Sequence, residues 1–497
     1  MITSHFYTCR MENIMHSIWK ESKKEIGAKR LEKDISVDVA IVGGGMAGIL
    51  TAYLLKQQGI HSVILEGSKI ASGQTGNTTA KITSGHNLIY DKITTKFGKE
   101  TASLYASANQ KAIAKYQEVI KNENIECHYK TLPNYVYSLR DPKLIEDEVK
   151  ACKEAGLDAE FTLNTTLPFL VDGAIKLKDQ GQFNPMEFIN GLVPSLHIYE
   201  DTMVREIKEN ILVTPHGKVK ADKIVVATHY PFINTPGYYF LRLHQERSYV
   251  IALEDATSLD GMYIDEDIHG FSFRNYEDKL LLGGSGHRTG DNKHGGCYER
   301  LRKVAKEYYP ESKELYHWSA QDAMSLDSIP YIGQYSSATP NMYVATGFNK
   351  WGMTNSMVSA MLLNDLIIDK KNPFEEVYSP KRFTISASMM NLFEEGKQAV
   401  TGLVKQKFTI PDTLISEIKN GYGGEVDYQD EKVGVYKDDT GKVYMVTTKC
   451  PHLGCKLEWN QDELSWDCPC HGSRFNYEGE LLDNPAMRGI HNIKIIE

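Results

Sequence analysis

Two short segments near the C-terminal end of the chain each place a cysteine close to a histidine. The first reads CPHLGC over residues 450–455, and the second reads CPCHGS over residues 468–473. Four of the eight cysteines of the chain fall in these segments. Residues 1–10 show no long apolar core, so we expect no signal peptide. Cysteines clustered in this way, without a secretion signal, predict a metal site rather than a disulfide scaffold.

The spacing of these residues favours an iron–sulfur cluster over zinc. The candidate metal ligands are Cys450, His452, Cys468 and His471. Two thiolates can bind one iron of a [2Fe–2S] cluster while two imidazoles bind the other, which raises the reduction potential into a range of about −150 to +300 mV. Zinc also binds two cysteines and two histidines, but zinc fingers usually pair cysteine with cysteine and histidine with histidine. Here each segment contributes one of each kind.

The two segments resemble those of the Rieske proteins of cytochrome bc complexes. The resemblance implies a small all-β domain and a disulfide between Cys455 and Cys470, with two free thiols in a reducing cytosol as the alternative. It also implies that the Ser473 hydroxyl donates a hydrogen bond to a cluster sulfur. Phe475 stands where the family has a tyrosine, so we expect a potential below the top of the family's range. Residues 484–486 resemble the proline loop that covers the cluster.

A glycine-rich turn near the N-terminal end predicts a dinucleotide site. Residues 43–48 read GGGMAG between an expected strand (37–42) and an expected helix (46–57). Gly43, Gly45 and Gly48 permit a tight turn and the close approach of a pyrophosphate to the helix N-terminus. Glu66 follows the next expected strand (62–65) and can accept hydrogen bonds from ribose hydroxyls.

Four further segments decide between FAD and NAD. Residues 73–81 (GQTGNTTAK), Ala227 after an apolar strand, and residues 327–333 and 347–354 resemble the FAD-contacting segments of the D-amino-acid-oxidase superfamily of flavoproteins. The resemblance covers residues 37–370 and implies FAD, bound without a covalent link even though His86 lies near. The FAD-binding residues that it implies, beside those named above, are Thr75, Thr78, Thr79, Ala227, Gly347, Gly352, Met353 and Thr354.

Together these patterns predict an α/β FAD-binding Rossmann-like domain with an α+β substrate domain, followed by a small all-β Rieske domain. The expected parts are an N-terminal extension (1–36), an oxidoreductase domain (37–370), a linker with a helix (371–409) and the Rieske domain (410–497). The substrate subdomain is expected mainly within 90–200 and 236–318. In the Rieske domain, residues 432–436 and 443–447 predict a hairpin.

Candidate catalytic residues come from motif position and from charge. Lys350 and Trp351 lie in the segment that the family places near the flavin ring, and Trp351 fits a core position equally well. Arg247 and Arg274 are candidates for binding a substrate carboxylate, because the guanidinium offers two parallel hydrogen bonds. Tyr249, His287 and Arg288 are further polar candidates. The acidic residues 265–267 are expected to form a solvated loop rather than a metal site.

The net charge is −9, with acidic and basic residues mixed along the chain and no basic stripe, so we expect no nucleic-acid partner. The longest uncharged run (39–55) contains the glycine motif and therefore predicts a strand, turn and helix rather than a transmembrane segment. We expect a cytoplasmic protein, with peripheral association with a membrane left open.

The most specific hypothesis is an FAD-dependent dehydrogenase that oxidises a C–N bond of a small amine or amino-acid-like substrate. It would pass electrons singly through the [2Fe–2S] cluster to an unknown external acceptor, a protein or a quinone. The main alternative is a flavin and Rieske redox relay or sensor without an amine substrate. A Rieske oxygenase is disfavoured, because no pair of histidines at helical spacing offers a mononuclear iron site and the Rieske segment comes last.

Overall fold

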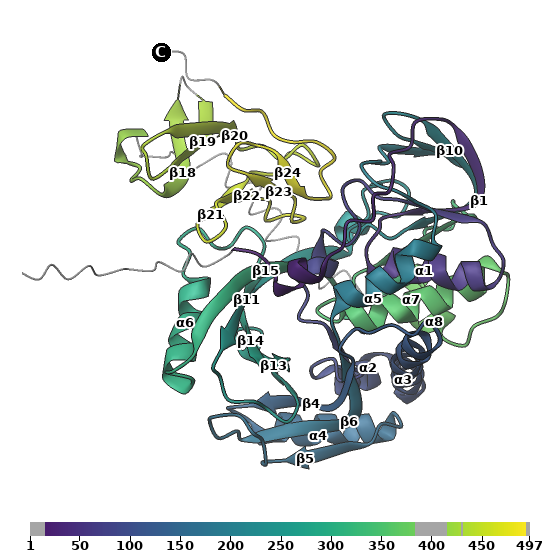
Figure 1. Cartoon of the computed structure of the whole chain (residues 1–497), viewed down its shortest axis with the longest axis vertical. Coiled ribbons are helices and arrows are strands. Elements are labelled where there is room, and N and C mark those ends of the chain that lie inside the picture. The colour runs from purple at the N-terminus through teal and green to yellow at the C-terminus, as the bar shows by residue number, and fades with distance from the viewer. Residues whose placement is uncertain (1–14, 383–414, 429–430, 494–497) are drawn as a thin grey trace, which may run out of the picture.

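The computed structural model describes residues 15–382, 415–428 and 431–493 (Figure 1). The predicted β–α–β unit is present: strands β1 (Ile35–Val42) and β2 (Ser62–Leu65) pair in parallel, and helix α1 (Met46–Gln57) connects them. The run of β-branched residues in β1 is buried on both faces, as expected for a central parallel strand. The glycine turn between β1 and α1 therefore lies at the carboxyl edge of this sheet.

The sheet around this unit has the order β16–β17–β10–β1–β2–β7, with β9 paired to β10 and β8 paired to β9. The added strands are β7 (Ile198–Tyr199), β8 (Glu206–Lys208), β9 (Ile211–Val213), β10 (Lys218–Val226), β16 (Tyr331–Gln334) and β17 (Met342–Thr346). Strands β10 and β17 pair in parallel, which confirms the mainly parallel sheet that the sequence predicts.

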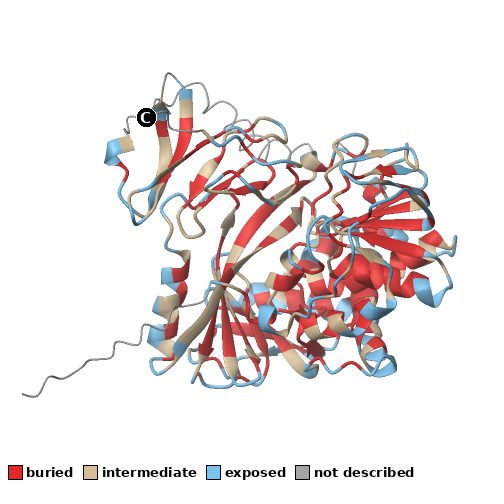
Figure 2. Ribbon diagram, turned by 45° about the horizontal axis from the view of Figure 1, so that its top comes forward, coloured by how far each residue is buried: buried red, intermediate tan, exposed pale blue. Residues whose placement is uncertain are grey.

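Helices α1, α5 (Pro185–Leu192) and α7 (Gly352–Ile367) pack beside this sheet, and α8 (Glu375–Tyr378) follows α7 (Figure 1). Helix α7 is buried almost all round, which explains its small and apolar composition (Figure 2). Its N-terminus begins directly after Trp351 and so faces the same edge of the sheet as the glycine turn.

A nine-stranded sheet forms the second part, with the order β15–β11–β14–β13–β12–β4–β6–β3 and β5 attached to β6. Its strands are β3 (Lys81–Ile82), β4 (Lys130–Ser138), β5 (Ala159–Thr162), β6 (Gly173–Gln182), β11 (Leu243–Glu254), β12 (Met262–Asp265), β13 (Phe271–Tyr276), β14 (Lys279–Arg288) and β15 (Lys313–Ser325). Helices α4 (Pro142–Glu154) and α6 (Cys297–Tyr308) pack on this sheet, while α2 (Ile89–Phe97) packs against α4 and α3 (Lys99–Asn122) packs against α2 and α7. This sheet draws strands from a wider span than the expected substrate subdomain.

The C-terminal domain is all β, as predicted. One sheet contains β18 (Tyr422–Tyr428), β19 (Glu431–Lys437) and β20 (Val443–Thr447), and the other contains β21 (Glu458–Asn460), β22 (Ser465–Asp467), β23 (Arg474–Asn476) and β24 (Leu481–Asp483). The antiparallel pairing of β19 with β20 confirms the predicted hairpin. Gly423 and Gly434 lie against the indole rings of Trp459 and Trp466, where an added Cβ would come within 2.4 Å of a ring atom.

The expected N-terminal extension and the expected linker both reach beyond the described residues. The described part of the N-terminal extension (15–36) packs on the oxidoreductase part: Trp19 is fully buried, and its indole N–H donates to the carbonyl of Thr78 at 2.6 Å. The helix expected in the linker (386–407) lies outside the described residues, so the boundary between the domains stays a prediction. No helix in the described ranges is long and apolar enough to cross a membrane.

Candidate functional site

A cavity of about 940 Å³ lies where the parallel sheet, the nine-stranded sheet and the C-terminal domain meet. The glycine turn and Glu66 line it from the parallel sheet, and residues of β11, β14 and β15 line it from the other sheet. The C-terminal domain contributes Leu481, Leu482, Asp483, Asn484, Ala486 and Met487. The predicted proline loop of the cluster domain therefore forms part of the wall of the predicted flavin site.

The glycine turn is built for close approach of a phosphate. Gly43 has a φ of +106°, and a Cβ at this position would lie 2.5 Å from the carbonyl oxygen of Ala227 on the neighbouring strand. A Cβ at Gly48 would lie 2.1 Å from the oxygen of Gly43, so α1 packs directly on the turn. The first residues of α1, Met46 and Ala47, line the cavity, so a helix N-terminus suited to a phosphate faces it.

The Glu66 carboxylate closes this end of the cavity. It accepts hydrogen bonds from the backbone N–H of Gly44 at 2.7 Å and of Ser68 at 2.8 Å. Burial raises the pKa of Glu66, although both hydrogen bonds favour the charged form. A carboxylate held in this way keeps lone pairs free for the ribose hydroxyls of a dinucleotide.

Most of the predicted FAD-binding residues line the cavity. Those that do are Gly43, Gly45, Glu66, Thr75, Thr78, Thr79, Ala227, Gly352 and Met353. Gly48, Gly347 and Thr354 do not. Thr354 instead exchanges two hydrogen bonds of 2.9 Å with the backbone of Thr83, which ties α7 to the segment after β3. The cavity volume, the glycine turn and Glu66 together fit FAD.

Trp351 and Lys350 both line the cavity, where their motif position places them. The Trp351 ring stacks on His86, with centroids 4.9 Å apart and an interplanar angle of 17°. His86 is hydrogen-bonded to the Tyr105 hydroxyl and the Thr83 carbonyl, both at 2.6 Å. Burial lowers the pKa of His86 to about 3, so its ring is neutral. These rings make a rigid, uncharged wall.

The two arginines proposed to bind substrate are engaged elsewhere. Arg274 is fully buried and donates to the carbonyls of Thr79 and Ala80 at 2.6 and 2.7 Å, so it holds the predicted FAD loop. Arg247 pairs with Glu463 of the C-terminal domain at 2.6 Å. Neither side chain lines the cavity, and this placement does not support a catalytic role for them. The partners of both lie far away in the sequence, so local patterns could not reveal them.

Of the other polar candidates, Tyr249 lines the cavity, and Asn460 of the C-terminal domain donates to its hydroxyl at 3.4 Å. The hydroxyl of Tyr249 lies 2.9 Å from Nε2 of His287, and Arg288 donates to the carbonyl of Pro469 at 3.4 Å. The acidic segment 265–267 differs from the solvated loop that we expected. Asp265 is only 6% exposed and lines the cavity, and burial raises its pKa to about 7.

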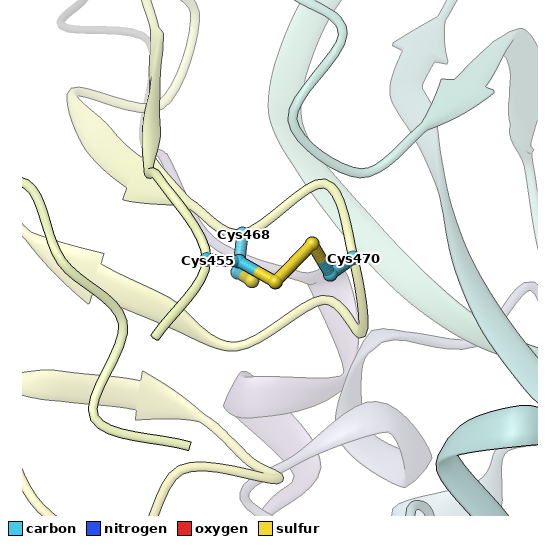
Figure 3. A group of neighbouring side chains, drawn as sticks. All are labelled: Cys455, Cys468 and Cys470. Carbon is cyan, nitrogen blue, oxygen red and sulfur yellow. A yellow bond between two sulfur atoms is a disulfide. The ribbon is translucent and has the colours of Figure 1, made fainter. Parts of the chain in front are cut away.

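The cysteines of the C-terminal domain fall into two pairs. Cys455 and Cys470 form a disulfide, whereas Cys450 and Cys468 are free and buried. The sulfurs of Cys455, Cys468 and Cys470 lie within 4.8 Å of one another (Figure 3), but two of them are bonded together and are not available as thiolates. A hydrogen bond with Cys468 lowers the pKa of Cys450 to about 7. The free pair is therefore the one suited to bind metal.

The two histidines complete a donor set for a cluster. The rings of His452 and His471 lie 4.9 Å apart, and the Nδ1 atom of each is buried without a hydrogen-bond partner in the described part of the chain. Burial lowers the pKa of His452 to about 4 and of His471 to about 3, so both imidazoles are neutral, the form that binds metal. Two free thiols and two unpartnered imidazole nitrogens fit a [2Fe–2S] cluster.

Both histidines face the flavin part of the chain. Nε2 of His452 lies 2.8 Å from Oδ1 of Asn234, and the ring of His471 meets Phe240 edge-on at 5.9 Å. Because Oδ1 can only accept, Nε2 carries the proton, which leaves Nδ1 free for a metal. The histidine edge thus contacts the loop before β11, while His452 stays half-exposed.

Two glutamines connect the cluster loop to the long strands of the nine-stranded sheet. Gln245 on β11 donates to the carbonyl of His471 at 2.7 Å, and Gln321 on β15 donates to that of Gly472 at 2.9 Å. The backbone N–H of Gln321 donates in turn to Gln74 in the predicted FAD loop at 2.6 Å. No sequence motif marks these residues, since only the strand register brings them together.

Comparisons with known proteins agree with this geometry. The family model described as FAD dependent oxidoreductase (DAO) matches residues 38–366, and that described as Rieske [2Fe-2S] domain matches residues 409–494. The chain is 34% identical to the Rieske 2Fe-2S iron-sulfur protein YhfW of Bacillus subtilis (strain 168), over 96% of this chain and 97% of the relative.

More distant matches cover the oxidoreductase part. Gamma-glutamylputrescine oxidoreductase of Escherichia coli (strain K12) is 23% identical over 68% of this chain and 85% of its own length. The crystal structure of glycine oxidase from Geobacillus kaustophilus superposes with a TM-score of 0.58 and 18% identity, over 70% of this chain and 99% of that one. The latter similarity establishes the fold alone.

Proposed function

The chain belongs to the DAO family of FAD dependent oxidoreductases and carries a C-terminal Rieske [2Fe-2S] domain, and from this we propose that it is a dehydrogenase acting on a C–N bond. The substrate is a small amine or amino-acid-like molecule. Its oxidation removes two electrons and two protons to form an imine, which water hydrolyses to a carbonyl compound and an amine or ammonia. The electrons leave through the cluster to an external acceptor.

The observation that carries this proposal is the shared wall between the two sites. Asp483, Asn484 and Ala486 of the Rieske domain line the same cavity as the FAD-binding glycine turn. The side chain of Asn484 also donates to the carbonyls of Thr228 and Tyr230, at 3.0 and 2.7 Å. FAD supplies the acceptor for the electron pair of the substrate, and the cluster supplies one-electron transfer. A Rieske domain next to the flavin cavity would give a dehydrogenase a route for electrons from the flavin to an external acceptor.

The residues of the chain would prepare the cavity for such a reaction. Trp351 and the neutral His86 would exclude water from one wall, and Gly352 begins the helix whose N-terminus faces the cavity. Lys350, held by Glu246 at 3.1 Å, would place a fixed positive charge there. Cys450, His452, Cys468 and His471 would hold the cluster.

The names of two similar proteins support a substrate with an oxidisable C–N bond. One relative of the oxidoreductase part is named for gamma-glutamylputrescine, and one structural neighbour is a glycine oxidase. Both names describe molecules with an oxidisable C–N bond. The proposed dehydrogenase passes its electrons to the cluster, whereas an oxidase passes them directly to oxygen.

A second, smaller cavity offers a place where electrons could leave. It measures about 370 Å³ and is lined by residues of both domains, among them His452, Asn234, Arg205 and Arg488. Both arginines are exposed, and neither forms an ion pair with a described residue. An acceptor with acidic groups would be attracted to this surface next to a predicted iron ligand.

Anaerobic mixing of the purified protein with a panel of amines and amino acids tests the proposal. A substrate should bleach the flavin absorbance and then produce the EPR signal of a reduced Rieske cluster. If the whole panel leaves the flavin oxidised while a reduced partner protein reduces it, the chain is a redox relay instead.

A further inference from the structure

Two carboxylates face the cavity from neighbouring strands. Glu246 on β11 and Asp322 on β15 are directly opposite each other in the antiparallel register, and both line the cavity. Residues directly opposite in such a pair have Cβ atoms about 4.5–5.5 Å apart, so their charges interact. Like charges at this distance are unfavourable unless each carboxylate has a partner.

Only one of the two carboxylates has a partner among the residues that the structure describes. Glu246 is 7% exposed and meets Lys350 at 3.1 Å and His244 at 3.4 Å. Burial opposes its charge, but the hydrogen bond from His244 and the charge of Lys350 lower the pKa of Glu246 to about 2. It is therefore a fully ionised, compensated acid.

Asp322 lacks this compensation. Its carboxylate makes no hydrogen bond and no ion pair with any residue that the structure describes. The nearest available cations are committed elsewhere, because Lys350 pairs with Glu246 and Arg247 pairs with Glu463. Burial raises the pKa of Asp322 to about 7. Asp322 is half-buried, and a carboxylate that faces a ligand cavity without a partner among the described residues is a group that a cation would satisfy.

In the rest of the cavity wall, acidic residues outnumber basic ones. Asp265, Glu266 and Asp267 line it as well, and no arginine lines it among the residues that the structure describes. The lining lysines are Lys81, Lys92 and Lys350, each of which has a polar partner: Thr79, Ser328 and Glu246, respectively. The wall therefore lacks the free guanidinium fork that suits a carboxylate.

We propose that Asp322 binds the protonated amino group of the substrate, and that the substrate is a cationic amine without a carboxylate beside its reacting C–N bond. This inference rests on the proposed dehydrogenase function and narrows its substrate class from amino acids to amines. An α-amino acid would bring its carboxylate close to Glu246 and Asp322, where the neighbouring cation Lys350 already pairs with Glu246. An amine brings only a positive charge, which would compensate the Asp322 carboxylate.

The test uses the FAD-loaded, full-length protein and its Asp322→Asn variant, which keeps the shape of the side chain. The reactive probes are 1,4-diaminobutane, n-butylamine, glycine, L-alanine and L-proline, mixed anaerobically. We expect the amines to bleach the flavin and the amino acids not to. In Asp322→Asn the amine concentration for half-maximal bleaching should rise about tenfold or more.

A binding measurement separates this inference from the proposed function. Butyltrimethylammonium carries the charge of an amine but has no N–H for imine formation, and its binding is followed by the change in the spectrum of the oxidised flavin. We expect binding to the wild type and to Glu254→Gln, a control on the same strand outside the cavity that pairs with Lys313. Binding to Asp322→Asn should be about tenfold weaker or absent.

The outcomes are distinct. If amino acids bleach the flavin as well as amines do, or if Asp322→Asn binds the ammonium probe as tightly as the wild type, the inference is wrong while C–N oxidation stands. If the probe binds through Asp322 but none of the amines or amino acids bleaches the flavin, the cation site stands and the dehydrogenase proposal fails.

Discussion

The side-chain oxygen of Asn234, in the loop before β11, accepts a hydrogen bond from Nε2 of His452, at 2.8 Å. His452 is a predicted ligand of the [2Fe–2S] cluster, and Asn234 belongs to the flavin part of the chain. The contact fixes the tautomer and the orientation of the imidazole. It makes the flavin domain part of the surroundings that set the properties of the cluster.

This contact should lower the reduction potential of the cluster. An acceptor on the N–H increases the electron density of the imidazole and thereby stabilises oxidised iron. Asn234→Leu removes the acceptor, so we expect the potential to rise by about 20–60 mV, which corresponds to about 0.5–1.5 kcal/mol for a single hydrogen bond and one electron. EPR-monitored titration measures the change. An unchanged potential would show that the hydrogen bond does not form in the holoprotein.

The ion pair between Arg247 and Glu463 should hold the two domains together. Both side chains are at most 8% exposed, and Glu463 also pairs with Arg474 at 2.8 Å. Burial opposes the charge of Glu463, but Arg247 and Arg474 lower its pKa to about 2. Arg247→Met leaves a buried carboxylate with one partner fewer and should destabilise the protein by about 3–5 kcal/mol. Urea unfolding measures this loss.

The matched control is the double variant Arg247→Met/Glu463→Gln. It removes both members of the pair, so it should recover part of the lost stability. If the double variant is as unstable as the sum of the two single variants, the two side chains do not interact and the domain contact depends on other residues.

Amine binding should depend on pH through Asp322. Its pKa is raised to about 7 by burial; Lys350 and Arg247 oppose this shift, while Glu246 adds to it. Below pH 7 the carboxyl is neutral, so the apparent Kd for the ammonium probe should fall about tenfold per pH unit as pH rises toward 7, and then level off. The Asp322→Asn variant should show a flat profile. A slope that persists in this variant would assign the titration to another group.

Asp322 should also affect the free energy of unfolding, which should fall as pH rises, whereas binding of the ammonium probe becomes tighter. Because the folded pKa of Asp322 lies above its unfolded value of about 4, the folded state binds the proton more tightly. The stability from this group is therefore present below pH 4 and is lost as pH rises from about 4 to about 7. Comparing the urea midpoints of the wild type and Asp322→Asn across this range measures the effect.

Iron and sulfide analysis tests the cluster ligands. The wild type should contain about two irons and two acid-labile sulfides for each chain. Cys468→Ser should lose both and the visible absorbance of the cluster, while Cys127→Ser, at a buried thiol far from the cluster in the sequence, should keep them. FAD should remain bound to both variants. Zinc in the wild type would contradict the cluster and remove the electron exit.

Local patterns were sufficient for the elements that carry the cofactor motifs. The strand before Gly43, the helix after it and the hairpin of β19 and β20 depend on residues close together in the chain, so their spacing alone predicts them. The same holds for the Cys–His segments, because each metal-binding loop places its cysteine and histidine within a few residues of each other.

The roles of individual polar side chains depend on contacts between segments that are far apart in the sequence. The sequence by itself determined the cofactors, since each motif is a short peptide whose backbone or side chains meet the ligand directly. Only the tertiary structure decided that Arg247 serves the domain contact, that Asp322 faces the cavity without a partner in the described ranges, and that Asn234 contacts His452. The physical reason is that burial, charge compensation and hydrogen bonding are properties of the neighbours in space, and these neighbours are up to 218 residues apart in the chain.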